Sequence, residues 1–285
     1  MIGVGGRKDK RSMQVQKILR RLDEAALGTV FLGVVAILYG IACFLQGEFH
    51  DFWQPVPENL PLRQPLAYLA AGLLVVSGSG LLMARTVRPA AMLLLLIFAL
   101  YDACYLRLLI GPPLNANALM GLAEQTSVVV GAGVILLQMR GSGPAGATVA
   151  RITFGVCSLI FGLAHFVAPV QTGNMVPEWL PGGQVFWAIA TGVGHAAVGL
   201  GLIANRFAVP ATRLGASMYM CFVLLAWLPG AFTHPTEWLR WEGSAISLCM
   251  AAALWLVGDL LASQRRTDAA WPAGNRIGGE ASAST

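Results

Sequence analysis

The chain has 285 residues, of which 56% are hydrophobic and only 12% carry a charged side chain. Soluble domains carry ~25% charged residues, so this composition excludes an ordinary water-soluble globular protein. The net charge of +5 comes from Lys and Arg placed at particular connections, and it is not evidence for nucleic-acid binding.

Eight long apolar runs follow one another along the chain. A helix needs about 20 apolar residues to cross the hydrocarbon core, and each run holds roughly 18–22. Strands of a membrane β-barrel would be half as long and would alternate in polarity. The sequence therefore predicts an all-α integral membrane protein with eight transmembrane helices. The predicted spans are 25–46, 66–84, 90–110, 119–139, 152–170, 185–204, 214–232 and 244–261.

The positions of Lys and Arg predict the orientation. If the N-terminus is cytoplasmic, only Arg63, Arg107 and Arg240 of the 19 Lys and Arg residues fall at the outer side. This is the pattern of the positive-inside rule, and it predicts N-in and C-in termini in a bacterial cytoplasmic (inner) membrane. Residues 1–24 then form a basic cytoplasmic segment. Residues 263–285, rich in Ala, Gly, Ser and Thr, form a disordered cytoplasmic tail.

Two short motifs occur twice. Tyr-Gly-Ile-Ala-Cys-Phe at 39–44 returns as Phe-Gly-Leu-Ala-His-Phe at 161–166, which is 122 residues later. Val-Pro-Glu-Asn-Leu-Pro at 56–61 returns as Val-Pro-Glu-Trp-Leu-Pro at 176–181, which is 120 residues later. Self-similarity at one period indicates a duplicated unit.

The two predicted units span 25–140 and 145–262, with four helices in each. Because four is an even number, both units enter the membrane in the same orientation. They are then parallel repeats related by an axis along the membrane normal. The predicted architecture is two parallel-repeat four-helix bundles side by side.

The second unit resembles the DoxX-like family of small four-helix membrane proteins. The first unit shows the resemblance more loosely, because Cys43 stands where the second unit has His165. Asn59 likewise stands where the second unit has Trp179. The resemblance rests on 161–166, 176–181, Thr191, Gly192, Leu228, Pro229, His234 and Pro235.

The resemblance implies a membrane component associated with quinones or redox chemistry. Some relatives resemble subunits of terminal quinol oxidases or thiosulfate:quinone oxidoreductases, and others belong to redox-stress membrane complexes. Likeness of fold alone does not carry chemistry, so the candidate residues must be argued from their own positions.

Polar residues within the predicted spans are candidates for function because each must be paired or used there. Asp102 and Glu124 fall about 12 Å and about 8 Å from the outer ends of the third and fourth helices. Arg107 is close enough in sequence to neutralise one of them. These three residues predict an intramembrane polar network. It either forms a proton or substrate site open to the outer face or holds the first bundle together.

Two histidines stand out in the second unit. His165 falls in the outer third of its helix and His195 near the middle of the membrane. Imidazole exchanges protons near neutral pH and can also bond a quinone carbonyl. The alternative is a histidine that only bonds a neighbouring helix.

Glu178 and Trp179 lie between prolines in an outer loop of the second unit. Trp179 and Trp227 belong either to an aromatic belt at the membrane interface or to a pocket with His165 as its floor. In that pocket Trp227 and His234 form the sides. The candidate ligand-binding residues are His165, Glu178, Trp179, His195, Trp227 and His234.

Motifs of soluble enzymes are absent from the sequence. None of the five cysteines forms a C-x-x-C pair, and the four histidines are not spaced for a metal site. A stand-alone enzyme is therefore not expected. The sequence favours a quinone- or redox-associated component first, then a small-solute or proton-coupled carrier, then a non-catalytic scaffold of a membrane complex. The expected partners are the lipid bilayer and either a membrane redox complex or a lipid-soluble small molecule, with quinone as the candidate cofactor.

Overall fold

A computed structural model describes residues 27–50, 53–110, 115–140 and 143–279, with side chains up to Arg266. The described residues form helices joined by short loops, and they contain no strand. The elements are α2 (Leu27–Gln46), α3 (Arg63–Leu81), α4 (Val87–Leu108), α5 (Ala116–Arg140), α6 (Pro144–Val167), α7 (Pro169–Gly173), α8 (Gln184–Ile203), α9 (Ala208–Cys221), the π-helix η1 (Phe222–Trp227), α10 (Leu228–Thr233) and α11 (Trp238–Gly279).

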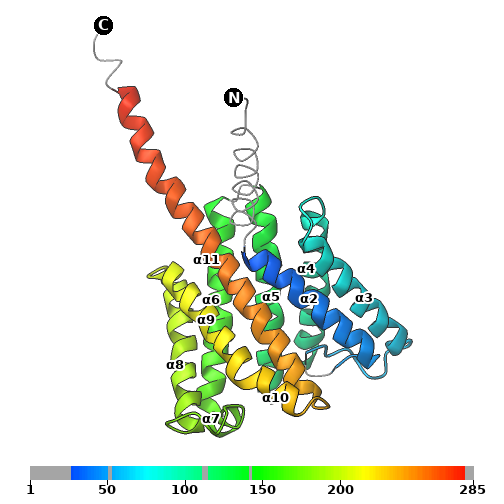
Figure 1. Ribbon diagram of the computed structural model, residues 1–285. Coiled ribbons are helices and arrows are strands. Elements are labelled where there is room, and N and C mark those ends of the chain that lie inside the picture. Colours follow the sequence, from blue (N-terminus) through cyan, green and yellow to red (C-terminus); the bar gives the residue numbers. More distant parts are fainter. Residues whose placement is uncertain (1–26, 51–52, 111–114, 141–142, 280–285) are drawn as a thin grey trace, which may run out of the picture.

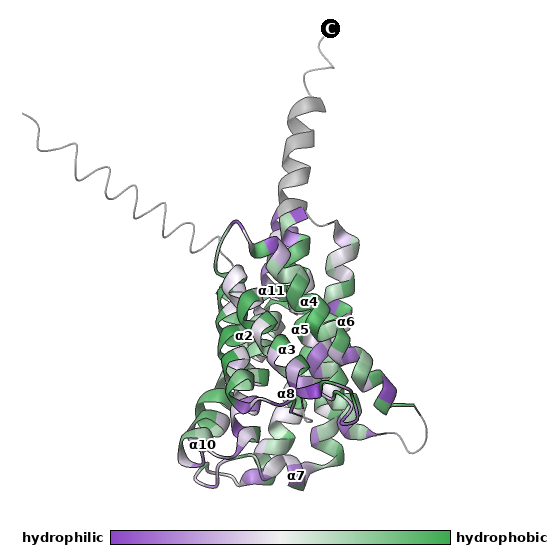
Figure 2. Ribbon diagram, turned by 90° about the vertical axis from the view of Figure 1, so that its right-hand side faces the viewer, coloured by the Kyte–Doolittle hydropathy of each residue, from purple (hydrophilic) through white to green (hydrophobic). Residues whose placement is uncertain are grey.

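Eight helices among the described residues are long and apolar enough to cross a membrane. Each predicted span overlaps one of them. Hydrophobic residues cover the helices and hydrophilic residues gather toward their two ends (Figure 2). The chain thus has the helices of a multi-pass membrane protein, as the sequence predicts.

Two helices begin earlier than their apolar runs. α4 starts at Val87 and α9 at Ala208, so Pro89 and Pro210 lie in the first turn of a helix. Proline is well suited to that turn because the amide it lacks has no partner within the helix there. The predicted turn residues therefore begin helices.

The eight spans form one assembly. Consecutive helices pack in pairs, α2 with α3, α4 with α5, α6 with α8, and α9 with α11. Helices α5 and α11 also pack against each other between the two groups (Figure 1), and α11 contacts α2 while α5 contacts α6. The last helix of each predicted unit thus packs on the first helix of the other, so the two predicted bundles share an extensive interface. The common ancestry of the units remains a prediction.

Corresponding glycines bring helices together in both units. A Cβ on Gly78 of α3 would lie 2.5 Å from the carbonyl oxygen of Gly33 in α2. A Cβ on Gly199 of α8 would lie 2.8 Å from the carbonyl oxygen of Gly155 in α6. Small residues of this kind let helix backbones approach closely in membranes.

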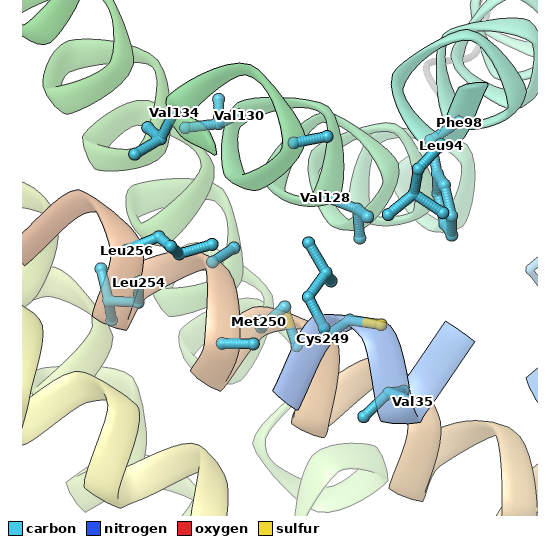
Figure 3. Packing of buried hydrophobic residues seen from close by; sticks show 14 of the residues in the cluster. Val35, Leu94, Phe98, Val128, Val130, Val134, Cys249, Met250, Leu254 and Leu256 are labelled. Atoms are coloured by element: carbon cyan, nitrogen blue, oxygen red, sulfur yellow. The ribbon is translucent and has the colours of Figure 1, made fainter. Parts of the chain in front are cut away.

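The buried core includes the region where α2, α5 and α11 meet. Val35, Val128 and Leu256 are buried in it (Figure 3). A Cβ on Gly131 of α5 would lie 2.8 Å from the Cβ of Ala253 in α11. Apolar side chains gain little by leaving lipid, so close van der Waals contact, more than hydrophobic burial, stabilises these helix pairs.

Two arginines predicted at cytoplasmic connections lie inside helices. Arg151 of α6 is buried and donates to the carbonyl oxygen of Ile203 at 2.8 Å, at the C-terminal end of α8. Arg213 of α9 pairs with Asp259 of α11 and donates to the carbonyl oxygen of Trp255 at 3.0 Å. Cations are favourable at helix C-termini, so Arg151 stabilises the end of α8.

The ends of the membrane part lie together. The start of α2 and the distal part of α11 are at the same end of the molecule (Figure 1). The predicted basic segment 1–24 lies outside the described residues. The predicted tail 263–285 overlaps α11, which continues to Gly279, and 280–285 lie outside the described residues. The assignment of that end to the cytoplasm stays a prediction.

Candidate functional site

His165 and His195 lie together. His165 is near the end of α6 and His195 is in the middle of α8, and their ring centroids are 5.1 Å apart. His195 is buried, with 3% of its surface exposed, whereas His165 is half-buried. The close packing of Gly162 against α8 sets this pairing, because a Cβ there would lie 3.1 Å from the carbonyl oxygen of Gly192.

Three aromatic side chains surround His195. The hydroxyl of Tyr219 in α9 lies 3.4 Å from its Nδ1. The rings of Phe161 and Phe222 have centroids 5.7 Å and 6.0 Å from that of His195. We call His165, His195, Phe161, Tyr219 and Phe222 the histidine cluster. It joins three spans and combines polar ring atoms with apolar faces.

The hydrogen bonds of the cluster assign the proton on one ring. Nδ1 of His165 lies 2.8 Å from the carbonyl oxygen of Phe161. A carbonyl only accepts, so Nδ1 carries the proton and Nε2 of the neutral ring is an acceptor. Within the described residues, Nε2 of neither histidine has a hydrogen-bond partner in the protein. Neither atom is therefore occupied by a hydrogen bond within the described part of the protein.

The helix that carries Tyr219 changes from α-helical to π-helical geometry beside the cluster. α9 continues into the π-helix η1, and η1 ends where α10 begins. Pro229 lies in the first turn of α10. Proline inside a continuous helix removes a hydrogen bond and clashes with the preceding turn, and a π-helical segment can absorb that misfit. Phe222, which faces His195, is the first residue of η1. Such π-segments are frequent at functional sites.

The other four residues predicted around a pocket lie elsewhere. Glu178 and Trp179 are exposed, Trp179 to 67%. Trp227 packs its ring onto Gly243 of α11. His234 is exposed, and its Nδ1 lies 3.0 Å from the hydroxyl of Thr233.

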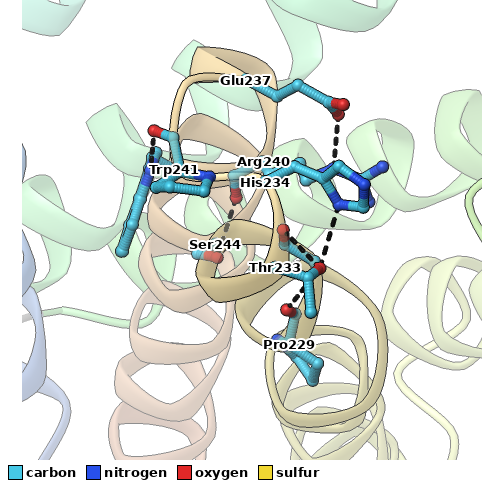
Figure 4. Close-up of polar contacts among 9 residues, drawn as sticks. Pro229, Thr233, His234, Glu237, Arg240, Trp241 and Ser244 are labelled. Atoms are coloured by element: carbon cyan, nitrogen blue, oxygen red, sulfur yellow. Dashed lines mark hydrogen bonds and ion pairs between the residues drawn. The ribbon is translucent and has the colours of Figure 1, made fainter.

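Figure 4 shows the setting of His234. It lies at the end of α10, close to the short ion pair between Glu237 and Arg240, whose atoms are 2.5 Å apart. None of the contacts that the described residues make joins His234 to His165 or His195. The structure thus brings the two predicted histidines together and separates them from the four outer residues.

The polar network predicted in the first unit is only partly formed. Both carboxylate oxygens of Asp102 lie 3.2 Å from the hydroxyl of Thr126, which links α4 to α5. Arg107 is exposed and, among the described residues, makes no ion pair with Asp102 or Glu124. It instead lines an open pocket of ≈ 470 Å³ together with Glu58 and its neighbours at the outer loop.

Glu124 is a buried carboxyl group for which the described residues supply no partner. It is only 7% exposed, on α5. Across the described residues it has neither a hydrogen bond nor an ion pair. It lies close enough to Glu242 of α11 for the two carboxyl groups to interact electrostatically.

Sequence reasoning missed Glu242, His50 and Tyr39. Glu242 was assigned to an outer loop because the last apolar run begins at 244, yet α11 begins at Trp238. Glu242 is consequently in the second turn of α11 and has 0% of its surface exposed. His50 follows α2, and its Nδ1 lies 2.5 Å from Oε2 of Glu242. A signal was present, since Trp238 and Trp241, three residues apart as on one face of a helix, directly precede Glu242.

No group of three or more His, Cys, Asp or Glu side chains that could hold a metal ion occurs within the described part of the chain. Residues 154–257, which run from α6 into α11, match the family model DUF8561, a domain of unknown function. The matched part contains the whole histidine cluster. Neither the curated proteins nor the solved structures provide a match to the chain.

Proposed function

We propose that this multi-pass membrane protein binds a lipid-soluble quinone or quinol at the histidine cluster. The observation that carries the proposal is the pair of imidazole rings, 5.1 Å apart, whose Nε2 atoms have no partner among the described residues. A pair left open within an aromatic surrounding suits a ligand with both polar and apolar parts.

The chemistry of the two rings suits the two redox forms of such a ligand. His195 can donate from Nε2 to a quinone carbonyl when Tyr219 donates to its Nδ1. His165 has an acceptor at Nε2 and can take a hydrogen bond from a quinol hydroxyl. Phe161 and Phe222 offer apolar ring faces beside His195. The protein would then bind the quinone and pass protons, with electrons supplied by a partner.

The resemblance to the DoxX-like family supports this assignment, since that family includes relatives of quinol-oxidizing complexes. We propose the bacterial inner membrane as the location, with both termini in the cytoplasm, because of the positive-inside pattern. The paired glycine contacts support the proposal of two parallel repeats. The histidine cluster belongs to the second of them.

Ligand binding can be tested by thermal stabilisation in lipid nanodiscs. A ligand that binds only the folded protein raises the unfolding temperature in a concentration-dependent way. A short-tailed ubiquinone analogue is expected to stabilise the wild type. His195→Leu removes one hydrogen bond of about 1 kcal/mol, which should weaken binding about fivefold. His234→Leu, an exposed histidine on the same side, is the matched control and should leave binding unchanged.

Equal binding by the wild type and His195→Leu would contradict the proposal, as would the absence of stabilisation at saturating quinone. In that case the carrier and the scaffold would be the remaining functions. The small-solute carrier would rest on Asp102 and Glu124, and the scaffold would need no site.

A further inference from the structure

A second polar cluster lies between the first unit and α11, at the end of the molecule that carries the loop between α2 and α3. Its centre is Glu242, which is completely buried. Nδ1 of His50 lies 2.5 Å from Oε2 of Glu242, and the hydroxyl of Tyr39 donates to Oε1 at 3.2 Å. Charged side chains inside membrane proteins are costly and mark functional positions.

The loop that carries His50 folds into the bundle. Trp53 and Gln54 are each only 1% exposed, although they lie between two helices. The backbone amide of His50 donates to Oε1 of Gln54 at 3.2 Å, and Nε2 of Gln54 donates to Tyr101 at 3.0 Å. Gln125 of α5 donates to the carbonyl oxygen of Trp53 at 2.7 Å. The loop is therefore held in place, and irregular backbone at this depth is tolerated because protein surrounds it.

His50 connects this interior to the surface. Its side chain is 28% exposed, whereas that of Glu242 is fully covered. Nδ1 of His50 and Oε2 of Glu242 are close but are not aligned as a hydrogen bond, and both are buried without such a partner. Oε1 of Gln125 and Nε1 of Trp53 nearby are also buried without a hydrogen-bond partner. Such orphaned atoms are normally satisfied by water. They indicate that the protein atoms alone do not complete this cluster.

The charge balance around Glu242 is incomplete as well. Among the described groups close enough to interact with it, His50 is the one that can become a cation. The other titratable groups that face it are Tyr39 and Cys43 from α2, Tyr105 from α4 and Glu124 from α5. Two carboxylates and a neutral imidazole carry a net charge of −2, so the group is neutral overall only when two protons are bound among Glu242, Glu124 and His50.

We propose that Glu242 and His50 form a proton-exchange site between α11 and the first unit. His50 takes a proton from the water outside. The Nδ1–H bond then breaks as an Oε2–H bond forms on Glu242, which leaves a neutral imidazole and a neutral carboxylic acid. Tyr39 keeps its hydrogen bond to Oε1, and the reverse transfer returns the proton. Glu124 is the second carboxyl group that can hold a proton in the same interior.

This site is independent of quinone binding, because it shares no residue with the histidine cluster and the test needs no ligand. Infrared spectra of the protein in nanodiscs, recorded between acidic and alkaline pH, should show a protonated carboxyl band that changes with pH. Glu242→Gln, which keeps the shape and a hydrogen-bonding group, should abolish part of that band. Glu237→Gln changes an exposed glutamate of the preceding loop and should leave the band intact.

Tyr39→Phe and His50→Phe separate a proton site from a structural tether. Without the Tyr39 hydrogen bond, the carbonyl stretch of protonated Glu242 should move to higher frequency. Without His50, exchange of the carboxyl proton for deuterium should become slower, because its route to water is lost. A band that is the same in the wild type and Glu242→Gln would overturn the proposal. A deuterium exchange rate unchanged in His50→Phe would also overturn it.

Discussion

The pair α2–α3 and the pair α6–α8 cross at corresponding glycines, yet the residues beside the two crossings differ. In the first pair, Gly40 packs against the backbone amide of Val75. In the second, Gly162 packs against that of Ala196. The same register places the fully buried Leu74 at the position of His195. The spacing of 120 residues between the two Val-Pro-Glu motifs would place Val75 there, so the packing shifts the alignment by one residue.

The loops that follow the two first helices differ as well. After α2, the loop turns inward, and Trp53 is 1% exposed. After α6, the chain forms the short helix α7, and Trp179 in the loop beyond it is 67% exposed. The comparison teaches that helix crossings persist through backbone contact, whereas the loops decide what occupies the space beside them. The first unit packs its own loop beside the crossing, whereas the second has the two histidine rings there, whose Nε2 atoms lack a hydrogen-bond partner among the described residues.

The largest expected effect tests the shared crossings. Gly78→Ala and Gly199→Ala place a methyl group against a backbone carbonyl that cannot move aside. We expect each to lower the free energy of unfolding by about 3 kcal/mol, at the upper end for overpacking. Thermal unfolding in detergent measures this. Gly72→Ala is the control, because no atom lies within 4 Å of the added Cβ. A harmful Gly78→Ala with a silent Gly199→Ala would break the comparison.

The next effect concerns the inward loop. Gln54→Leu leaves Tyr101 and the backbone amide of His50 without their partner in the interior. An unsatisfied buried group costs about 1–3 kcal/mol, so we expect about 2 kcal/mol of destabilisation. The matched variant in the second unit is Gln184→Leu, which removes a half-buried bond to the carbonyl oxygen of Val176, 2.6 Å long. Its smaller effect should appear in the same unfolding assay. Equal losses would mean that both loops are held equally firmly.

Two tyrosine hydroxyls sharpen the comparison further. Tyr39→Phe removes a bond to the buried carboxyl group of Glu242, and Tyr219→Phe removes a longer bond to His195. Hydrogen bonds to charged groups contribute about 1.5–3 kcal/mol and neutral ones about 1 kcal/mol. Tyr39→Phe should therefore destabilise the protein more, as measured by thermal unfolding. The opposite order would show that Glu242 is held mainly by His50.

The smallest effect is expected in the loop between α7 and α8. Trp179→Ala removes an exposed side chain that contacts no part of the histidine cluster. Its effect on unfolding should be within about 0.5 kcal/mol, as for most surface positions. Quinone stabilisation of the nanodisc-bound protein should also be unchanged. A clear loss of quinone stabilisation would place Trp179 at the ligand after all.

Part of the candidate site could be predicted from the sequence. His165 and His195 were predicted as a pair because imidazole in an apolar span is uncommon, and the structure brings their rings together. Glu178 and Trp179 were predicted as candidates for the same pocket because they lie between prolines in the loop that follows the helix of His165. Closeness along the chain does not determine which way a side chain points, however, and the structure leaves both side chains exposed. Glu242 was missed because polar and aromatic residues at its helix start look like a loop when only hydropathy is considered.

The sequence by itself determined the eight helices. Each span is a local property, since about 20 apolar residues must pair their own backbone groups in lipid. Tertiary structure alone decided that α5 pairs with α11, that Tyr219 reaches His195 and that His50 meets Glu242. Those contacts depend on which face each helix turns inward. In a bilayer, hydrophobicity barely distinguishes the faces, because lipid is as apolar as a protein interior. Glycine contacts and polar pairs between distant segments make that choice.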